Sequence, residues 1–278
     1  MNRFLLAGLL ASAFCFSLIG QARADIADIR GEDNSLELDV GGSLLKYGED
    51  TANSTFDTEE SWMPSVGFGG SLLTNSKNYP ILSNLYLSLN GSAVFGQTDY
   101  RGGLQNPITH VITPYNTTDN AEVYTLNGQI GHAFALSDSV MLTPLADFGY
   151  RYWKRTLTGS GGYEEDYKHY ELLGGFLVQY SPIKKLVLSL TGEGGSTINP
   201  NMTTSFGDHY TLGQSPVWEV GGKVGYMMTQ YFEGTAGVNF KGFGYGASGQ
   251  HVSDTTWEPA SYTHELTTQV GVAYHFAP

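Results

Sequence analysis

The stretch 261–276 constrains the fold of this chain more than any other. Apolar and aromatic side chains such as Val270, Val272 and Tyr274 occupy every second position, and polar side chains such as Glu265 lie between them. Because successive side chains of a strand point to opposite faces, this stretch predicts a β-strand with one apolar and one polar face. It is longer than the roughly 9–11 residues that a tilted strand needs to cross a bilayer.

The same alternation, bounded by turn signals, recurs along the chain and predicts ten strands. They cover about 35–47, 62–74, 81–97, 121–136, 140–157, 167–181, 186–196, 215–229, 231–244 and 261–276. Short connections (75–80, 137–139, 182–185 and 230) alternate with long ones (48–61, 98–120, 158–166, 197–214 and 245–260). This rhythm is typical of an up-and-down antiparallel barrel with short periplasmic turns and long outer loops. We therefore expect an all-β transmembrane barrel of about ten strands.

One face of every expected strand is apolar, and in a barrel this face lies against lipid. The expected lipid-facing side chains include Leu36, Leu38, Val40, Val66, Phe68, Leu87, Leu89, Leu126, Ile130, Phe148, Leu172, Phe176, Leu190, Val220, Val224, Val238 and Phe240. Aromatic residues lie near the strand ends, where a membrane barrel carries its girdles. A soluble β-sandwich shows the same alternation without girdles or regular loop asymmetry.

The first 24 residues have the pattern of a secretory signal peptide. Arg3 precedes the apolar run 4–19, and Ala22-Arg23-Ala24 provides a small-x-small cleavage site. We expect cleavage after Ala24, which leaves residues 25–278 as a single barrel domain. The only cysteine, Cys15, lies within the leader, so no disulfide is expected.

The mature chain is strongly acidic. The sequence has 14 lysine and arginine residues against 27 aspartate and glutamate residues. Two of the basic residues belong to the leader, so the mature net charge is −15, which argues against nucleic acid as a partner. After the leader, no apolar run is long enough for a spanning helix, which leaves a secreted β-protein or a membrane barrel.

The closing strand resembles the C-terminal strand of bacterial outer-membrane β-barrels, with Phe276 as its last aromatic residue. That resemblance implies a location in the outer membrane of a Gram-negative bacterium and contact with its lipid. It also implies insertion by the barrel assembly machinery, which reads the final aromatic residue. We expect a monomer.

The polar face of the strands carries charged residues that would line the lumen. The main members of this network are Asp147, Arg151, Glu171, Glu193, Glu219, Lys223 and Glu265. Unpaired charges in a narrow lumen are unfavourable, so we expect them to pair or to be hydrated. Neighbouring strands suggest Arg151 with Glu171, and Lys223 with Glu193 or Glu233. The network is either an ion-pair plug or the lining of a narrow pore.

Three lysines, Lys46, Lys154 and Lys168, are expected on the lipid side near the outer rim. They suit the phosphates of lipopolysaccharide, or each extends separately to water.

Acidic residues are concentrated in two of the expected outer loops. They are Glu49, Asp50, Asp57, Glu59 and Glu60 in the first loop and Glu164, Glu165 and Asp166 in the third. We expect these side chains to be solvated.

The sharpest catalytic candidate is Asp208-His209, just beyond the seventh expected strand. The chain resembles the omptins, which are ten-stranded outer-membrane proteases, in strand count, loop rhythm, length, closing strand and the Gly149-Tyr150-Arg151-Tyr152 region. In that family an Asp-x-His element and an acid pair across a groove hold the attacking water. The resemblance implies roles for Asp208, His209 and Asp99, although Asp208 directly precedes the histidine and Asp99 is a single acid.

A second enzymatic hypothesis, a lipid A deacylase, rests on His251-Val252-Ser253 in the fifth expected loop. No HExxH, P-loop or zinc-ligand spacing occurs, and we expect neither cofactor nor metal. The sequence therefore favours an envelope or surface protein, or a narrow diffusion channel, without a recognisable catalytic site. The alternative is an omptin-like endopeptidase acting on basic peptides.

Overall fold

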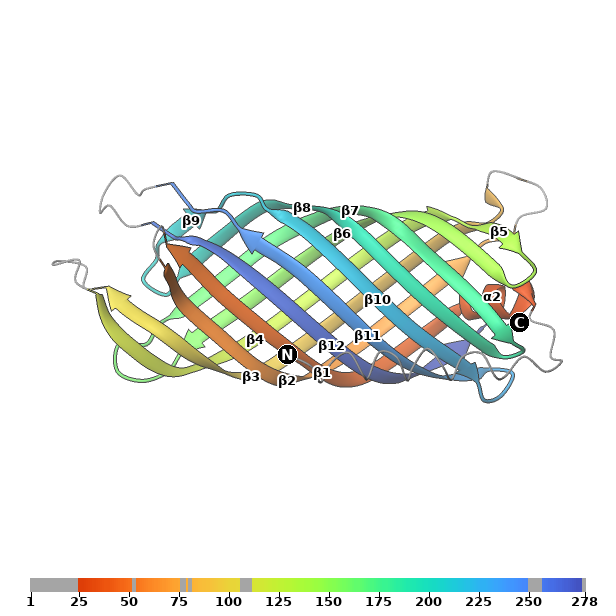
Figure 1. Cartoon of the computed structure of the whole chain (residues 1–278), viewed down its shortest axis with the longest axis horizontal. Coiled ribbons are helices and arrows are strands. Elements are labelled where there is room, and N and C mark those ends of the chain that lie inside the picture. Colours follow the sequence, from red (N-terminus) through yellow and green to blue (C-terminus); the bar gives the residue numbers. More distant parts are fainter. Residues whose placement is uncertain are drawn as a thin grey trace, which may run out of the picture.

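The computed structural model describes residues 25–51, 54–75, 79, 82–105, 112–249 and 257–276. These residues form a barrel of tilted strands with one short helix at the end where the chain terminates (Figure 1). In the labels of Figure 1 the elements are α2 (Ile26–Glu32), β1 (Ser35–Thr51), β2 (Ser54–Leu73), β3 (Leu85–Gln105), β4 (Ile112–His132), β5 (Phe134–Ser137), β6 (Val140–Leu157), β7 (Glu164–Ile183), β8 (Leu186–Thr204), β9 (His209–Thr211), β10 (Pro216–Met227), β11 (Phe232–Tyr245) and β12 (Ala260–His275).

Ten of the strands form a closed antiparallel ring. Each strand pairs with its neighbours in the order β1, β2, β3, β4, β6, β7, β8, β10, β11 and β12, and β12 pairs back with β1. The two remaining strands are short: β5 pairs with β6, and β9 pairs with the outer end of β8. Closure satisfies the backbone N–H and C=O groups that an open sheet would leave unpaired in lipid. The expected fold and all ten strands are confirmed.

The strands extend well beyond their expected outer ends. β1 continues to Thr51 and β2 begins at Ser54, while β3 and β4 remain paired as far as Gln105 and Ile112. Much of the sequence expected to form long outer connections is therefore β-ladder. The alternation of inward and outward side chains continues through the described part of these stretches. Polar residues occur on both faces there, so the hydrophobic pattern of the sequence does not show the alternation.

A belt of exposed apolar side chains surrounds the barrel. Val270, Val272, Leu172 and Phe148 are each about half exposed, and all point away from the lumen. Aromatic side chains border the belt, with Trp62, Tyr124 and Trp218 towards the outer end and Phe134, Tyr180, Phe232 and Tyr274 towards the inner end. This belt makes the fold a transmembrane barrel. Among the described residues, no helix is long and apolar enough to cross a membrane.

The barrel continues beyond the outer aromatic border. We call this part the outer extension; it comprises the described residues of 45–60, 96–122, 153–168, 197–215 and 243–261. At the opposite end, α2 lies beside the inner ends of the strands (Figure 1) and contacts β6, β7 and β8. Buried charged residues occur in the lumen between these two ends as well as in the outer extension.

Candidate functional site: the closed lumen

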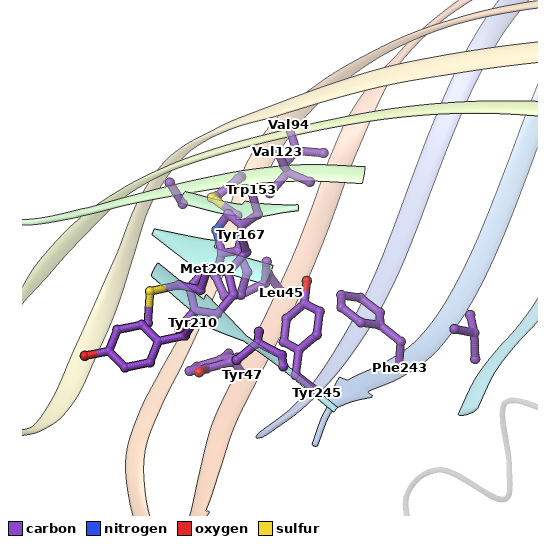
Figure 2. Close-up of a cluster of buried hydrophobic side chains, with 14 of the residues drawn as sticks. Leu45, Tyr47, Val94, Val123, Trp153, Tyr167, Met202, Tyr210, Phe243 and Tyr245 are labelled. Carbon is purple, nitrogen blue, oxygen red and sulfur yellow. The ribbon is translucent and has the colours of Figure 1, made fainter. Parts of the chain in front are cut away.

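A layer of large side chains closes the lumen near its outer end. It includes Tyr47 from β1, Trp153 from β6, Tyr167 from β7 and Tyr245 from β11, all buried in one cluster (Figure 2). The Tyr47 and Trp153 rings meet edge to face with centroids 5.1 Å apart. Since β1 and β6 lie nearly opposite one another in the ring, this contact reaches across the lumen.

The guanidinium of Arg155 lies within this aromatic layer. Its Cζ is 4.7 Å from the centre of the Tyr47 ring and 5.3 Å from that of Trp153. The Arg155 Nε donates to Glu59 Oε1 at 3.0 Å, and Nη1 lies 2.5 Å from Glu165 Oε2. Arg155 is 1% exposed, so the group is a buried ion-pair network that strands β2, β6 and β7 share.

The expectation of solvated acidic loops is wrong for Glu49, Asp57, Glu59 and Glu165, all of which are buried. They occupy inward positions of strand segments that the sequence predicts to be outer loops. Asp57 accepts a hydrogen bond from the Tyr100 hydroxyl at 2.6 Å and another from the Gly103 backbone N–H at 3.1 Å. These carboxylates belong to the interior of the outer extension, where each replaces water with a protein donor.

Burial, together with an excess of carboxylates over basic groups, raises several pKa values in the outer extension. Burial raises the pKa of Asp57 to about 6. Burial, with the neighbouring Glu59 carboxylate, raises the pKa of Asp119 to about 8. Burial, with the Glu165 carboxylate, raises that of Glu258 to about 8, and Glu258 accepts a 2.7 Å hydrogen bond from Tyr167. At neutral pH this region therefore binds protons that the same residues release in water.

Ion pairs cross the lumen just inside the aromatic layer. Arg151 on β6 makes a two-pronged contact with Glu265 on β12, and one of its hydrogen bonds is 3.1 Å long. These two strands stand opposite one another in the ten-membered ring, so the pair spans the barrel. Lys241 Nζ lies 2.5 Å from Glu171 Oε2 and 3.4 Å from Glu219 Oε2.

The charged residues expected in the lumen do line it, but the pairing differs from the expectation. Arg151 pairs with Glu265 rather than Glu171, and Lys223 pairs with Glu32 at 3.3 Å and Glu37 at 3.2 Å. The two other acids of the set, Asp147 and Glu193, accept hydrogen bonds from Asn127 and Gln129 at 3.1 and 3.3 Å. Alternation identifies the face of a side chain, but it does not identify the residue on the opposite wall.

A polar chamber of about 360 Å³ occupies the lumen below these ion pairs. Its lining includes Arg151, Lys241 and Glu265 from the ion-pair layer, and Glu32 and Asp33 from the N-terminal segment. The chamber therefore extends from the ion-pair layer to the helical end of the barrel.

The helix α2 forms the floor of the chamber, whereas the sequence predicts no regular element before residue 35. Asp25 caps the helix by accepting a hydrogen bond from the Ala27 N–H at 2.9 Å. Ile29 is fully buried among apolar residues from the inner ends of the strands. The His275 ring bridges Gly31 O and Glu233 Oε2, each at 2.8 Å. The local signals of the helix are the Asp25 cap and the isoleucines Ile26 and Ile29, three residues apart.

The three rim residues of the catalytic hypothesis are not brought together. Asp99 and His209 are exposed on the outer face, on β3 and β9, which are separated in the ring by β4, β6, β7 and β8. Asp208 Oδ2 accepts a hydrogen bond from the Thr204 hydroxyl at 3.2 Å. This arrangement does not form the water-holding groove that the resemblance implies. His251, Val252 and Ser253 lie outside the described residues.

The three lysines Lys46, Lys154 and Lys168 lie on the outer face near the outer rim. Lys46 pairs with Glu60 at 2.8 Å, Lys154 pairs with Glu164 at 2.7 Å, and the Lys168 ammonium lies 5.4 Å from the centre of the Tyr152 ring. Each ammonium therefore already has a protein neighbour.

Comparisons with known proteins find similarity in structure alone. No family model and no curated protein sequence matches the chain. The outer membrane protease OmpT from Escherichia coli superposes with a TM-score of 0.54 at 10% identity, covering 88% of this chain and 97% of that chain. The translocator domain of the autotransporter NalP from Neisseria meningitidis has a TM-score of 0.40 at 13% identity, covering 98% of this chain and 95% of that chain. The chain thus has the fold of an outer-membrane ten-stranded barrel, and this similarity extends to the fold alone.

Proposed function

We propose that this chain is an outer-membrane surface protein whose lumen is closed to diffusion. The observation that carries the proposal is the cross-lumen layer, in which Tyr47, Trp153 and the Arg151–Glu265 pair connect opposite walls. Ten strands enclose a lumen that side chains can fill, and here α2 forms a second barrier at the inner end. A surface role is supported by the outer extension, which carries β-hairpins beyond the apolar belt.

The narrow-channel alternative requires a continuous hydrated path past Arg151. Conductance of the purified protein in a planar bilayer decides between the two functions. We expect no resolved current steps, because α2 and the aromatic layer block the path independently. Stable steps in the wild-type protein that disappear when the sample is heat-unfolded would establish a channel and overturn the proposal.

The route to the membrane follows from the same proposal. Cleavage after Ala24, insertion by the barrel assembly machinery and a monomeric state in the outer membrane of a Gram-negative bacterium are all expected for such a barrel. The mass of the protein isolated from outer membranes tests the cleavage site, and its mass in native detergent solution tests the monomer.

We also propose that Lys46, Lys154 and Lys168 contact lipopolysaccharide phosphates. Their outward positions near the outer rim support this proposal, although each phosphate would compete with a neighbouring protein group. We expect lipopolysaccharide to raise the unfolding temperature of the wild-type protein and to raise that of a triple Lys→Gln variant less. An equal rise in both proteins would remove these lysines from the contact.

The enzymatic alternative is an omptin-like endopeptidase for basic peptides, with Asp208, His209 and Asp99 as candidate residues. Their separation leads us to expect no cleavage of a fluorogenic Arg-Arg peptide in the presence of lipopolysaccharide. Cleavage that is lost in an Asp208→Ala/His209→Ala double variant would replace the non-enzymatic proposal.

A further inference from the structure

The chamber in the lumen has more acidic than basic side chains. Eight carboxylate side chains line it, against the three basic side chains of Arg151, Lys223 and Lys241. All three basic groups are already engaged with glutamates. Among the described residues, the lining acids Asp147 and Glu193 form no ion pair with lysine or arginine. A buried negative charge requires either a proton or a cation.

Acids on neighbouring strands add to this excess. Glu193 on β8 and Glu219 on β10 are direct cross-strand partners. The Asp147 and Glu219 carboxylates both lie close enough to repel Glu193. Like charges in directly opposed positions destabilise a sheet, so this wall of the chamber would gain from a bound positive charge.

A separate observation at the floor also indicates a ligand that donates hydrogen bonds. Glu32, Asp33 and Gln179 each line the chamber and are more than nine-tenths buried. The Glu32 Oε2, Asp33 Oδ2 and Gln179 Oε1 atoms have no hydrogen-bond partner. Three buried acceptors without donors are unfavourable, and together they call for several N–H groups at one end of the chamber.

We infer that the chamber binds a linear aliphatic polyamine. One ammonium group would lie at the floor beside Glu32, Asp33 and Gln179, and another would lie beside Asp147 and Glu193. Each terminal ammonium carries three donors and no acceptor, which matches a wall of acceptors. Val94, Val123, Leu145 and Leu177 also line the chamber and offer apolar surface to the methylene chain.

The geometry favours such an extended cation over a metal ion. No group of three His, Cys, Asp or Glu side chains in the described part of the chain is placed to hold a metal ion. The acceptors are instead distributed between the floor and the wall. A volume of about 360 Å³ is at the small end of the range for small-molecule sites.

The ligand would enter at the inner end. The aromatic layer at the outer end is built from side chains of the barrel strands themselves, whereas α2 is a separate seven-residue segment. Lys223 holds Glu32 at 3.3 Å and Glu37 at 3.2 Å, so an incoming ammonium would compete with Lys223 for the same oxygens. Because the ligand would enter and leave at the inner end only, the chamber would bind it without conducting it across the membrane.

The test is isothermal titration calorimetry of spermidine into the purified protein in a neutral detergent at about 0.15 M salt, which weakens exposed-charge interactions. The lumen variant is Asp147→Asn/Glu193→Gln. The matched control is Glu60→Gln/Glu122→Gln, which removes two exposed acids from the outer face. Heat-modifiable mobility in SDS gels verifies that each barrel is folded, and the single variants replace the double variant if it does not fold.

We expect saturable binding by the wild-type protein and the control, and at least a tenfold weaker affinity in the lumen variant. The inference is overturned if the wild-type protein binds no spermidine, because protons then neutralise the chamber. It is also overturned if the lumen variant binds as tightly as the control, or if the control loses affinity as well, because the binding then belongs to the outer surface.

Discussion

The two ends of the lumen are closed by different means. At the outer end, Trp153, Tyr47 and Arg155 belong to the strands themselves, and their contacts join opposite walls. At the inner end, the closure is α2, a helix of seven residues that precedes the first strand. The outer closure can open only if the barrel deforms. The inner closure can open while every strand pair remains intact.

The two closures also differ in what stabilises them. The outer layer combines aromatic packing with a buried ion-pair network, in which one charged group forms ion pairs or hydrogen bonds with several others. A helix as short as α2 is not stable alone, so it depends on Ile29 and on a few polar contacts with the wall. We therefore expect substitutions at the outer end to affect global stability and substitutions at the inner end to act locally.

The largest effect is expected for Arg155→Met. This change leaves Glu59 and Glu165 buried without their basic partner, and breaking a buried pair from one side costs about 3–5 kcal/mol. Urea unfolding in detergent micelles measures the loss of global stability. The matched control, Arg101→Met at an exposed position of the outer face, should stay within about 0.5 kcal/mol of the wild type. An equal loss of unfolding free energy in both variants would mean that the buried Arg155 network adds nothing to barrel stability. The outer closure would then not be an integral part of the barrel.

Ile29→Asp should separate the inner closure from the barrel. Loss of a fully buried isoleucine typically costs about 2–5 kcal/mol, and here that energy holds α2 in place. Amide hydrogen exchange of residues 26–32 should then accelerate by at least about 30-fold, since about 1.4 kcal/mol corresponds to a factor of ten. The strands should keep their protection. Ala27→Asp, at an exposed position of the same helix, is the control.

The contrast between the two ends also explains how much the sequence could predict. Alternation correctly located the ten strands and assigned their faces, because a barrel in lipid needs apolar residues at every outward position. Inward and outward positions continue to alternate at Tyr47 and Glu49 in β1 and at Asp57 and Glu59 in β2. The sequence therefore contains a signal for the outer extension. The sequence predicts loops for these segments because their charged residues are typical of loops.

Other features had no adequate signal in the sequence. The Arg151–Glu265 pair joins strands on opposite sides of the ring. The sequences of the two strands do not show which of their residues lie at the same height along the barrel axis. The separation of Asp99 and His209 around the barrel likewise has no signal in the sequence. The helix α2 contains one buried isoleucine, which is too little for a recognisable helical period.

A pH change tests the outer closure without altering its packing. The pKa of Glu258 rises from an unfolded value of about 4.3 to about 8 in the folded protein. The folded state therefore binds more protons between these values, and stability falls as pH rises through this window. The ionisable groups near Glu258 are Tyr167, Glu165, Arg155, Asp57, Glu49 and Tyr47.

Thermal unfolding of wild type and Glu258→Gln at pH 5.5 and 8.5 measures this effect. Because glutamine stays neutral, the unfolding temperature of the variant should equal that of the wild type at pH 5.5 and exceed it at pH 8.5. Each kcal/mol of difference in the free energy of unfolding should change the unfolding temperature by about 2–4 °C. Glu60→Gln, which removes an exposed acid paired with Lys46, should show no such dependence. A variant that is less stable than the wild type at pH 8.5 would show that the Glu258 carboxylate stabilises the folded protein and that its pKa is not raised.

The smallest expected effect tests whether polar contacts contribute to the inner closure. The Arg30 guanidinium donates to Asn84 Oδ1 at 2.7 Å at a half-buried position. A hydrogen bond from a charged group contributes about 1.5–3 kcal/mol when buried, and partial exposure reduces this to about 1 kcal/mol or less. Arg30→Ala should therefore accelerate exchange in residues 26–32 by about five-fold, far less than Ile29→Asp. Asn84→Gly should match it, because it removes the same bond and glycine tolerates the positive φ of 65° at this position. If Arg30→Ala releases α2 as completely as Ile29→Asp, the inner closure is electrostatic, and the contrast between an integral outer closure and an apolar-anchored inner one is wrong.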